Sequence, residues 1–138
     1  MPDVRQLTDL QLAIMRVLWE RGEATAADVH EALRRARGLA PTTVATVLSR
    51  LEKKGVITHR AEGRQYFYRP AVSERDVRRS MVAGLTELLF EGDPAALVSH
   101  LITSRDVAPR DLQRVKELIR EKEREGGGKG RQGGRRDR

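Results

Sequence analysis

Residues 41–57, PTTVATVLSRLEKKGVI, are the most informative part of this chain about its fold. Pro41 suits the first position of a helix, because the N–H that proline lacks would have no partner there. Apolar residues then recur at the spacing of one helical face, namely Val44, Val47, Leu48 and Leu51. Gly55 suits the end of the helix, and residues 56–60 and 65–69 predict two strands around a turn at 61–64. The stretch therefore predicts a helix followed by a β-hairpin.

Two more helices are predicted before this stretch. Thr8 and Gln11 form a capping box at the start of the first, and Thr25 begins the second with Asp28 three residues on. Three helices and a hairpin in this order are typical of a winged helix-turn-helix. We therefore expect a mainly α chain with a small β-wing, in which residues 1–70 form a winged helix-turn-helix DNA-binding domain.

Residues 71–125 predict further amphipathic helices. Ser73, the pair Asp93 and Pro94, and Pro109 have the character of helix starts. So short a segment buries too little apolar surface to close a core alone, and a partner subunit is the simplest cover for its apolar faces. We expect a helical dimerisation domain. The residues predicted to line the dimer core are Leu85, Leu88, Leu97, Leu101, Val115 and Ile119.

The net charge of +7 is unevenly distributed along the chain. Residues 1–70 hold 12 Lys and Arg against eight Asp and Glu, and residues 126–138 hold five against one. The latter segment, GGGKGRQGGRRDR, has no apolar side chain, so we expect a disordered basic Gly/Arg tail. It is either a flexible solubilising extension or an arm that tracks DNA through phosphate contacts.

The composition excludes several classes of function. The chain has no cysteine, which excludes disulfides, thiolate metal sites and thiol nucleophiles. His30, His59 and His100 lack the spacing of a metal site, and no phosphate-binding loop or nucleophile motif occurs, so we expect neither an enzyme nor a cofactor. No apolar run approaches the roughly 18 residues of a membrane span, and no signal-peptide pattern opens the chain. We therefore expect a cytoplasmic protein with no membrane insertion.

The helix predicted from residue 41 carries a polar face opposite its apolar one. Thr43, Thr46 and Arg50 are three and four residues apart and share that face. Small hydroxyl side chains allow a close approach to the major groove, a threonine methyl packs on a thymine methyl, and arginine binds guanine or phosphate. We predict base-edge contacts for these three residues and a backbone contact for their neighbours Thr42 and Lys53.

The predicted hairpin adds two cations to this face. We place Arg60 and Arg64 at the tip of the wing, where they reach backbone phosphate or the minor groove. A lone helix with a polar face is more often merely solvated. The capped helix before it and the wing after it favour DNA binding.

Three segments resemble the penicillinase-repressor family, also called BlaI/MecI/CopY. They are LTDLQLAIMRVLWERGEATAADVHEAL at 7–33, PTTVATVLSRLEKKGVI at 41–57 and GRQYFYRP at 63–70. The combination of TTVATVLSRLEKKG with GRxYxYRP is far more specific than either alone. The resemblance covers residues 5–122, with a weaker match at DPAALVSHLI, 93–102.

The resemblance implies a homodimeric bacterial winged-helix repressor that binds a palindromic operator. In such repressors the helix matching 41–54 enters the major groove, and its hydroxyl and basic positions correspond here to Thr42, Thr43, Thr46 and Arg50. It further implies that helices within 73–122 entwine two subunits.

Two departures limit what the resemblance implies about signals. The C-terminal cysteine motif of copper-responsive members is absent. In β-lactam-responsive members a membrane sensor protease triggers cleavage of an Asn-Phe bond, and the matching positions here are His100 and Leu101. A membrane sensor protease is thus a candidate partner, and these two residues mark the candidate regulatory cleavage position.

The function expected from the sequence is sequence-specific repression of transcription by a homodimer on a pseudo-palindromic operator. The alternative is a winged-helix module that docks a partner protein and has no specific DNA binding. An interaction helix would expose large apolar anchors, whereas the polar face of the helix from residue 41 carries threonines and arginine.

Overall fold

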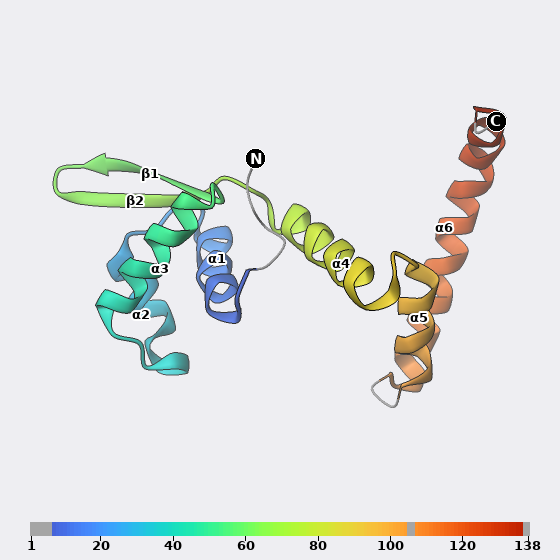
Figure 1. The fold of residues 1–138 in the computed structure, drawn as a ribbon, viewed down its shortest axis with the longest axis horizontal. Coiled ribbons are helices and arrows are strands. Elements are labelled where there is room, and N and C mark those ends of the chain that lie inside the picture. Colours follow the sequence, from blue (N-terminus) through green and yellow to red (C-terminus); the bar gives the residue numbers. More distant parts are fainter. Residues whose placement is uncertain (1–6, 105–106, 137–138) are drawn as a thin grey trace. The chain divides into compact units, whose positions relative to one another are not determined.

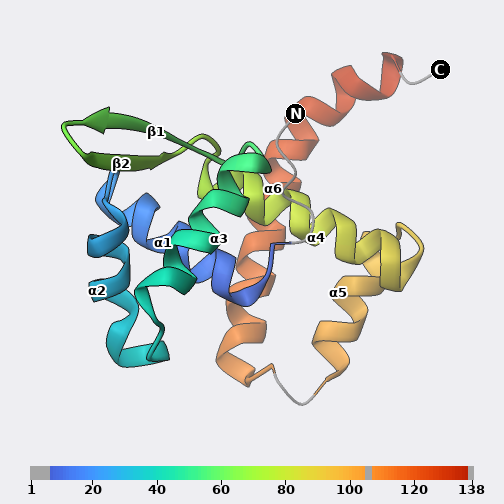
Figure 2. The ribbon, with the colours of Figure 1, turned by 60° about the vertical axis from the view of Figure 1, so that its left-hand side comes forward.

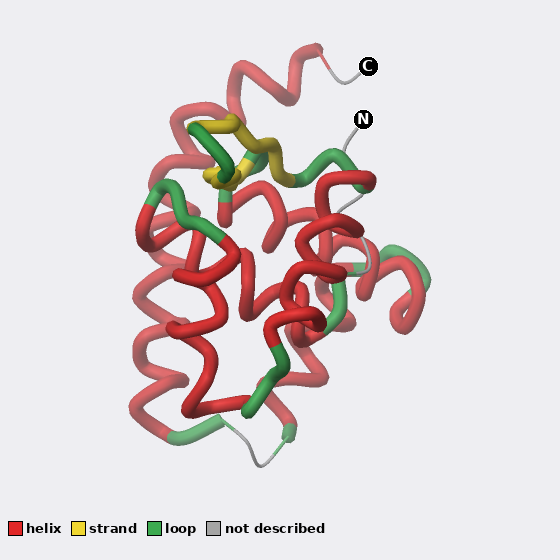
Figure 3. Tube along the Cα trace, turned by 90° about the vertical axis from the view of Figure 1, so that its left-hand side faces the viewer, coloured by secondary structure: helices red, strands yellow, loops and turns green. Residues whose placement is uncertain are grey.

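The computed structural model describes residues 7–104 and 107–136, with the side chains described as far as residue 126. The elements in chain order are α1 (Asp9–Arg21), α2 (Ala26–Arg37), α3 (Pro41–Lys53), β1 (Ile57–Glu62), β2 (Gln65–Pro70), α4 (Glu74–Phe90), α5 (Pro94–Thr103) and α6 (Pro109–Arg136). Figure 1 shows this order, and Figure 3 shows helix (red) with one small hairpin (yellow). The predicted fold class, mainly α with a small β-wing, is confirmed.

The helix starts follow the local chemistry of the sequence. Thr8 and Gln11 form a complete capping box at α1, and Thr25 and Asp28 form another at α2. Pro41 occupies the first turn of α3 as predicted. Each of these devices satisfies or removes backbone N–H groups that a helix start leaves unpaired.

One apolar core holds α1, α2, α3 and the hairpin together. Figure 2 shows the three helices packed beneath the two strands. The fully buried side chains come from all of these elements: Ile14, Met15, Leu18, Val29, Val44, Leu48, Leu51 and Ile57. The start of α4 joins the same core through buried Val77 and the partly buried Met81. The buried face of α3 is thus the one that the spacing of its apolar residues predicts.

The hairpin differs from its predicted form. The predicted turn at 61–64 is wrong, because β1 continues to Glu62, which pairs with Gln65. The connection is therefore only two residues long, and Gly63 adopts the positive φ of 64° that such a tight connection needs. The strands consequently extend beyond the helices, and residues 61–66 are all exposed.

The chain divides into two compact units, Met1–Leu89 and Phe90–Arg138. The first unit therefore contains most of α4 in addition to the winged helix. Its boundary lies later in the chain than residue 70, where the two functional domains predicted from the sequence meet. Trp19 contributes to this extension, because its Nε1 donates a hydrogen bond of 2.9 Å to the carbonyl oxygen of Val72, just before α4.

The second unit contains α5 and α6 and buries little. Among the described apolar side chains beyond Val77, none is fully buried. The backbone of α6 continues to Arg136 and so includes most of the segment 126–138. The disorder predicted there from composition stays a prediction, because the side chains beyond residue 126 lie outside the described part. No helix among the described residues is both long and apolar enough to cross a membrane.

Candidate nucleic-acid interface

The outward face of α3 brings the predicted contact residues together. Thr42, Thr43, Thr46, Arg50 and Lys53 are all exposed, because the opposite face of the helix faces the core. The first turn of α3 holds no acidic residue and no side-chain cap. Because Pro41 has no N–H and the N–H of Thr43 already donates to the carbonyl oxygen of Ala40, this turn offers a phosphate the N–H of Thr42 and the positive end of the helix dipole.

Thr46 has its hydroxyl engaged within the helix. Its Oγ1 donates a hydrogen bond of 2.9 Å to the carbonyl oxygen of Thr42. The hydroxyl proton is thus used, and what Thr46 offers outward is its methyl group and an oxygen lone pair. This arrangement favours apolar contact with a thymine methyl over donation to a base.

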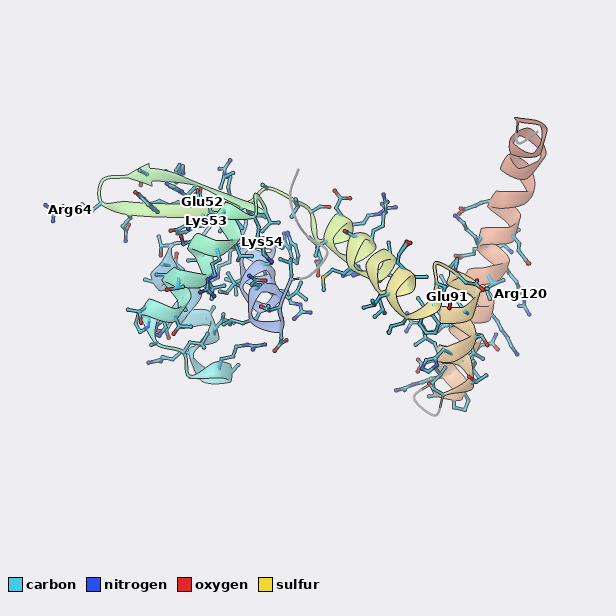
Figure 4. The ribbon with its side chains drawn as sticks, viewed as in Figure 1. Glu52, Lys53, Lys54, Arg64, Glu91 and Arg120 are labelled. Atoms are coloured by element: carbon cyan, nitrogen blue, oxygen red, sulfur yellow. The ribbon has the colours of Figure 1, made fainter. Side chains whose placement is uncertain are left out.

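Three cations of this surface are unpaired. Arg50, Lys53 and Arg64 form no ion pair within the part of the chain that the structure describes. Figure 4 shows Lys53 at the C-terminal end of α3 and Arg64 at the far end of the hairpin. Unpaired exposed cations are the groups that phosphate attracts.

Arg60 does not lie where the sequence predicts. It pairs with Phe67 across the hairpin, two rungs behind the pair of Glu62 and Gln65 that closes the turn, so its placement at the tip is wrong. Its guanidinium forms ion pairs with the carboxylates of Glu23 and Glu62. The prediction failed because it assumed a turn of four residues, which put Arg60 directly beside the turn, whereas only two residues connect the strands.

The two faces of the hairpin carry different chemistry. Residues opposite each other on antiparallel strands share a face, so His59, Tyr66 and Tyr68 lie on one side and Arg60 and Phe67 on the other. His59 faces α3, because its Nδ1 is 2.5 Å from Oε2 of Glu52. Its ring also stacks on Tyr66, with centroids 4.1 Å apart. Arg60 therefore lies on the face of the wing that points away from α3.

Sequence reasoning missed the contacts that fasten this hairpin. Glu23, between α1 and α2, binds Arg60 and also Arg69. Glu52 near the end of α3 binds His59. Strand alternation would have placed His59 beside Tyr68, but no local signal pairs either glutamate with its partner.

The remaining predicted residues lie on the later helices. Leu85 and Leu88 of α4, Leu101 of α5 and Ile119 of α6 are exposed, and Leu97 and Val115 are half-buried. His100 and Leu101 are both exposed in α5, and the His100 ring lies 5.7 Å from that of Phe90. No group of three or more His, Asp or Glu among the described residues could hold a metal ion.

Comparison with known proteins agrees with this geometry. The family described as "Penicillinase repressor" matches residues 7–121. The penicillinase repressor of Bacillus licheniformis is 24% identical over 88% of this chain and 94% of its own length. The transcriptional regulator BlaI of Mycobacterium tuberculosis is 40% identical over 74% of this chain and 75% of its own length.

A solved structure covers the first part of the chain. The solution structure of the DNA-binding domain of the repressor BlaI matches with a TM-score of 0.50 and 34% identity, over 55% of this chain and 93% of that one. Since the family match also continues through α4, α5 and the start of α6, this chain belongs to the penicillinase repressor family of winged-helix, DNA-binding transcriptional repressors, which are not enzymes.

Proposed function

We propose that this protein represses transcription by binding a pseudo-palindromic operator as a homodimer. One observation supports this above the others. The exposed face of α3 presents small hydroxyl side chains together with the unpaired cations Arg50 and Lys53, at the spacing that one major groove can accommodate. No residue of that face is a large apolar anchor.

The contacts divide by chemistry. Thr43, Thr46 and Arg50 read base edges and the groove floor, because they lie on the outward face of α3. Thr42 and Lys53 lie nearer its two ends and hold the DNA backbone, and the positive end of the helix dipole lies beside Thr42. Arg64 reaches the flanking backbone from the wing. Arg60 makes no such contact in this assignment, because Glu23 and Glu62 occupy it.

The homodimer is supported by the exposed apolar side chains of the later helices. Leu88 is 78% exposed, and Leu85, Leu101 and Ile119 are each more than 40% exposed. Apolar surface of this extent over three helices needs a cover, and a second copy supplies matching faces. Two α3 helices related by a two-fold axis require half-sites about 10 base pairs apart, or a multiple of that spacing.

Regulated cleavage by a membrane sensor protease belongs to the same proposal. The bond between His100 and Leu101 lies inside α5, which runs from Pro94 to Thr103, so the helix must open before a protease can act. Mass spectrometry of the repressor after induction tests this. A terminus newly formed at Leu101 supports the assignment, and intact repressor under full induction contradicts it.

The alternative, a protein-docking wing without specific DNA binding, has no support in the exposed face of α3. Docking helices anchor through large apolar or aromatic side chains. Here the outward positions are Thr42, Thr43, Thr46, Ser49 and Arg50. A polar surface of this kind fits DNA better than a protein groove.

The proposal is tested by selecting DNA from a random pool with the full chain. We expect an enriched sequence with two inverted half-sites, bound at least about 1,000-fold more tightly than random DNA at physiological salt. Gel-shift titrations at two salt concentrations measure that ratio. Selection of no common sequence, or equal affinity for selected and random DNA, contradicts specific repression.

A further inference from the structure

Glu23, in the turn between α1 and α2, holds two arginines of the wing. Its carboxylate accepts hydrogen bonds from Nε and Nη2 of Arg60, both at 2.9 Å, and from Nη2 of Arg69 at 3.3 Å. The Arg60 guanidinium also lies 4.5 Å from the centre of the Phe67 ring. The hydrogen bond from Arg60 lowers the pKa of Glu23, and the one to Glu23 raises the pKa of Arg60. Both groups therefore stay charged.

The backbone beside Glu23 is bound to the same strand. Ala24 and Tyr68 exchange two hydrogen bonds, of 2.9 Å and 2.8 Å, in an isolated antiparallel bridge. The turn between α1 and α2 is thus joined to the free edge of β2 through one residue, Ala24. Glu23 clamps this junction on the face of the hairpin that points away from α3.

The tip of the wing extends into solvent. Residues 61–66 are all exposed, and Figure 4 shows Arg64 at the end of this extension. A two-stranded ribbon is marginally stable without packing, so contacts at its base decide where its tip points. Those contacts are the burial of Ile57 in the core, the bridge at Ala24, the pair of His59 and Glu52, and the clamp at Glu23.

The charge of the clamp is balanced. Arg60 and Arg69 face the carboxylates of Glu23 and Glu62, with Glu62 at 3.1 Å from Arg60. A surface built for phosphate would leave its cations unpaired, as Arg64 is among the described residues. The arrangement therefore suits a structural clamp better than a DNA contact.

We propose that Glu23 is a positioning residue for operator binding. By clamping Arg60 and Arg69 it fixes the base of the wing and so aims Arg64 at the DNA backbone, without itself contacting DNA. This inference rests on the proposed function. The competing account is purely electrostatic: a carboxylate near DNA repels phosphate, so its removal strengthens binding to every DNA.

The two accounts predict opposite signs for Glu23→Gln. We expect this substitution to weaken binding to the selected operator about fivefold, the size typical of an exposed charge pair, and to weaken binding to random DNA as well, because the contact made by Arg64 is to phosphate. Glu62→Gln is the matched control. It removes the same charge from the same arginine, but Glu62 lies on the same strand as Arg60 and fastens nothing to the helices. We expect Glu62→Gln to leave operator binding unweakened.

A double-mutant cycle shows whether Glu23 acts through the tip. In an Arg64→Ala background, Glu23→Gln should have no further effect on operator affinity. Equal effects of Glu23→Gln and Glu62→Gln, tighter binding by Glu23→Gln, or full additivity with Arg64→Ala would each overturn the proposal.

Failure of this proposal is separable from failure of the proposed function. If the wild type does not prefer selected DNA, the proposed function is wrong; if it does and Glu23→Gln behaves as Glu62→Gln, only the clamp is wrong. Thermal melting checks that each variant folds. Should Glu23→Gln not fold, Arg60→Gln opens the clamp from the other side. It must weaken operator binding, and weakening that persists in an Arg64→Ala background would make Arg60 itself a phosphate contact.

Discussion

Arg50 is the arginine of the outward face of α3, exposed and without an ion pair among the described residues. If it binds a guanine edge, Arg50→Ala should cost about 1–3 kcal/mol of operator affinity and relax specificity at one base pair. Arg50→Lys keeps the charge but removes the planar fork, so it should leave binding to random DNA unchanged and should not restore the affinity for the operator. Equal weakening on operator and random DNA would show a phosphate contact instead.

Substitutions of Thr46 show whether its methyl group or its hydroxyl group contacts the operator. Since its hydroxyl already donates to Thr42, the methyl is the group free for a thymine. Thr46→Ser removes the methyl and should weaken operator binding by about 1 kcal/mol, whereas Thr46→Val keeps a methyl and should retain affinity. Titration of both variants against the selected operator decides the point. The opposite order would mean that the hydroxyl makes the contact.

Asp28 stabilises α2 in a way that depends on pH. The backbone N–H of Thr25 donates to its carboxylate at 3.1 Å, which lowers the pKa of Asp28 below its ordinary 3.8. A lowered pKa means that the stabilisation is present above the ordinary value and disappears as the pH falls through the lowered one. Asp28→Asn should therefore lower the free energy of unfolding by about 0.5 kcal/mol at neutral pH. The difference from wild type should shrink as the pH falls from neutral into the acid range and vanish once Asp28 is protonated in the folded protein.

Urea unfolding at neutral pH and at acidic pH measures the difference in the free energy of unfolding between Asp28→Asn and wild type. Thr25→Ala is the companion variant, because it removes the neutral half of the capping box and should cost about 1 kcal/mol. A pH-independent difference between Asp28→Asn and wild type would assign the effect to packing.

Helix α4 is buried near its start and exposed near its end. Val77 is buried in the core of the first unit, whereas Leu88 is 78% exposed. Leu88→Glu should therefore leave the protomer folded and abolish the dimer in sedimentation at micromolar concentration. Ala83→Glu is the control, since Ala83 is exposed and lies on the opposite side of the helix by its spacing. A monomeric wild type, or equal effects of both variants, would contradict a dimer through α4.

For the whole molecule, the net charge of +7 attracts DNA only in part through the winged helix. Five of the basic residues lie in 126–138. Truncation after Glu125 tests the DNA-tracking arm. If the arm binds phosphates, the dependence of log affinity on log salt should become shallower by about 0.9 for each phosphate that the truncated chain no longer neutralises. An unchanged slope would show that the segment is a solubilising extension.

Local sequence patterns predict the helices of the winged helix and the polar face of α3 correctly. Both capping boxes, at Thr8 and Thr25, and the buried stripe that contains Val44 and Leu48 are where the pattern predicts them. These features depend on residues within one or two helical turns of each other, and periodicity and capping chemistry describe that range well.

Contacts between distant segments, in contrast, set the position of Arg60 and the extent of the first unit. Arg60 meets Glu23 across 37 residues of chain, and α4 joins the core through Val77. The hairpin register also moved the turn from four residues to two. Ion pairs, strand register and unit boundaries arise from contacts between segments far apart in the chain, and no local pattern encodes which distant group a side chain will meet.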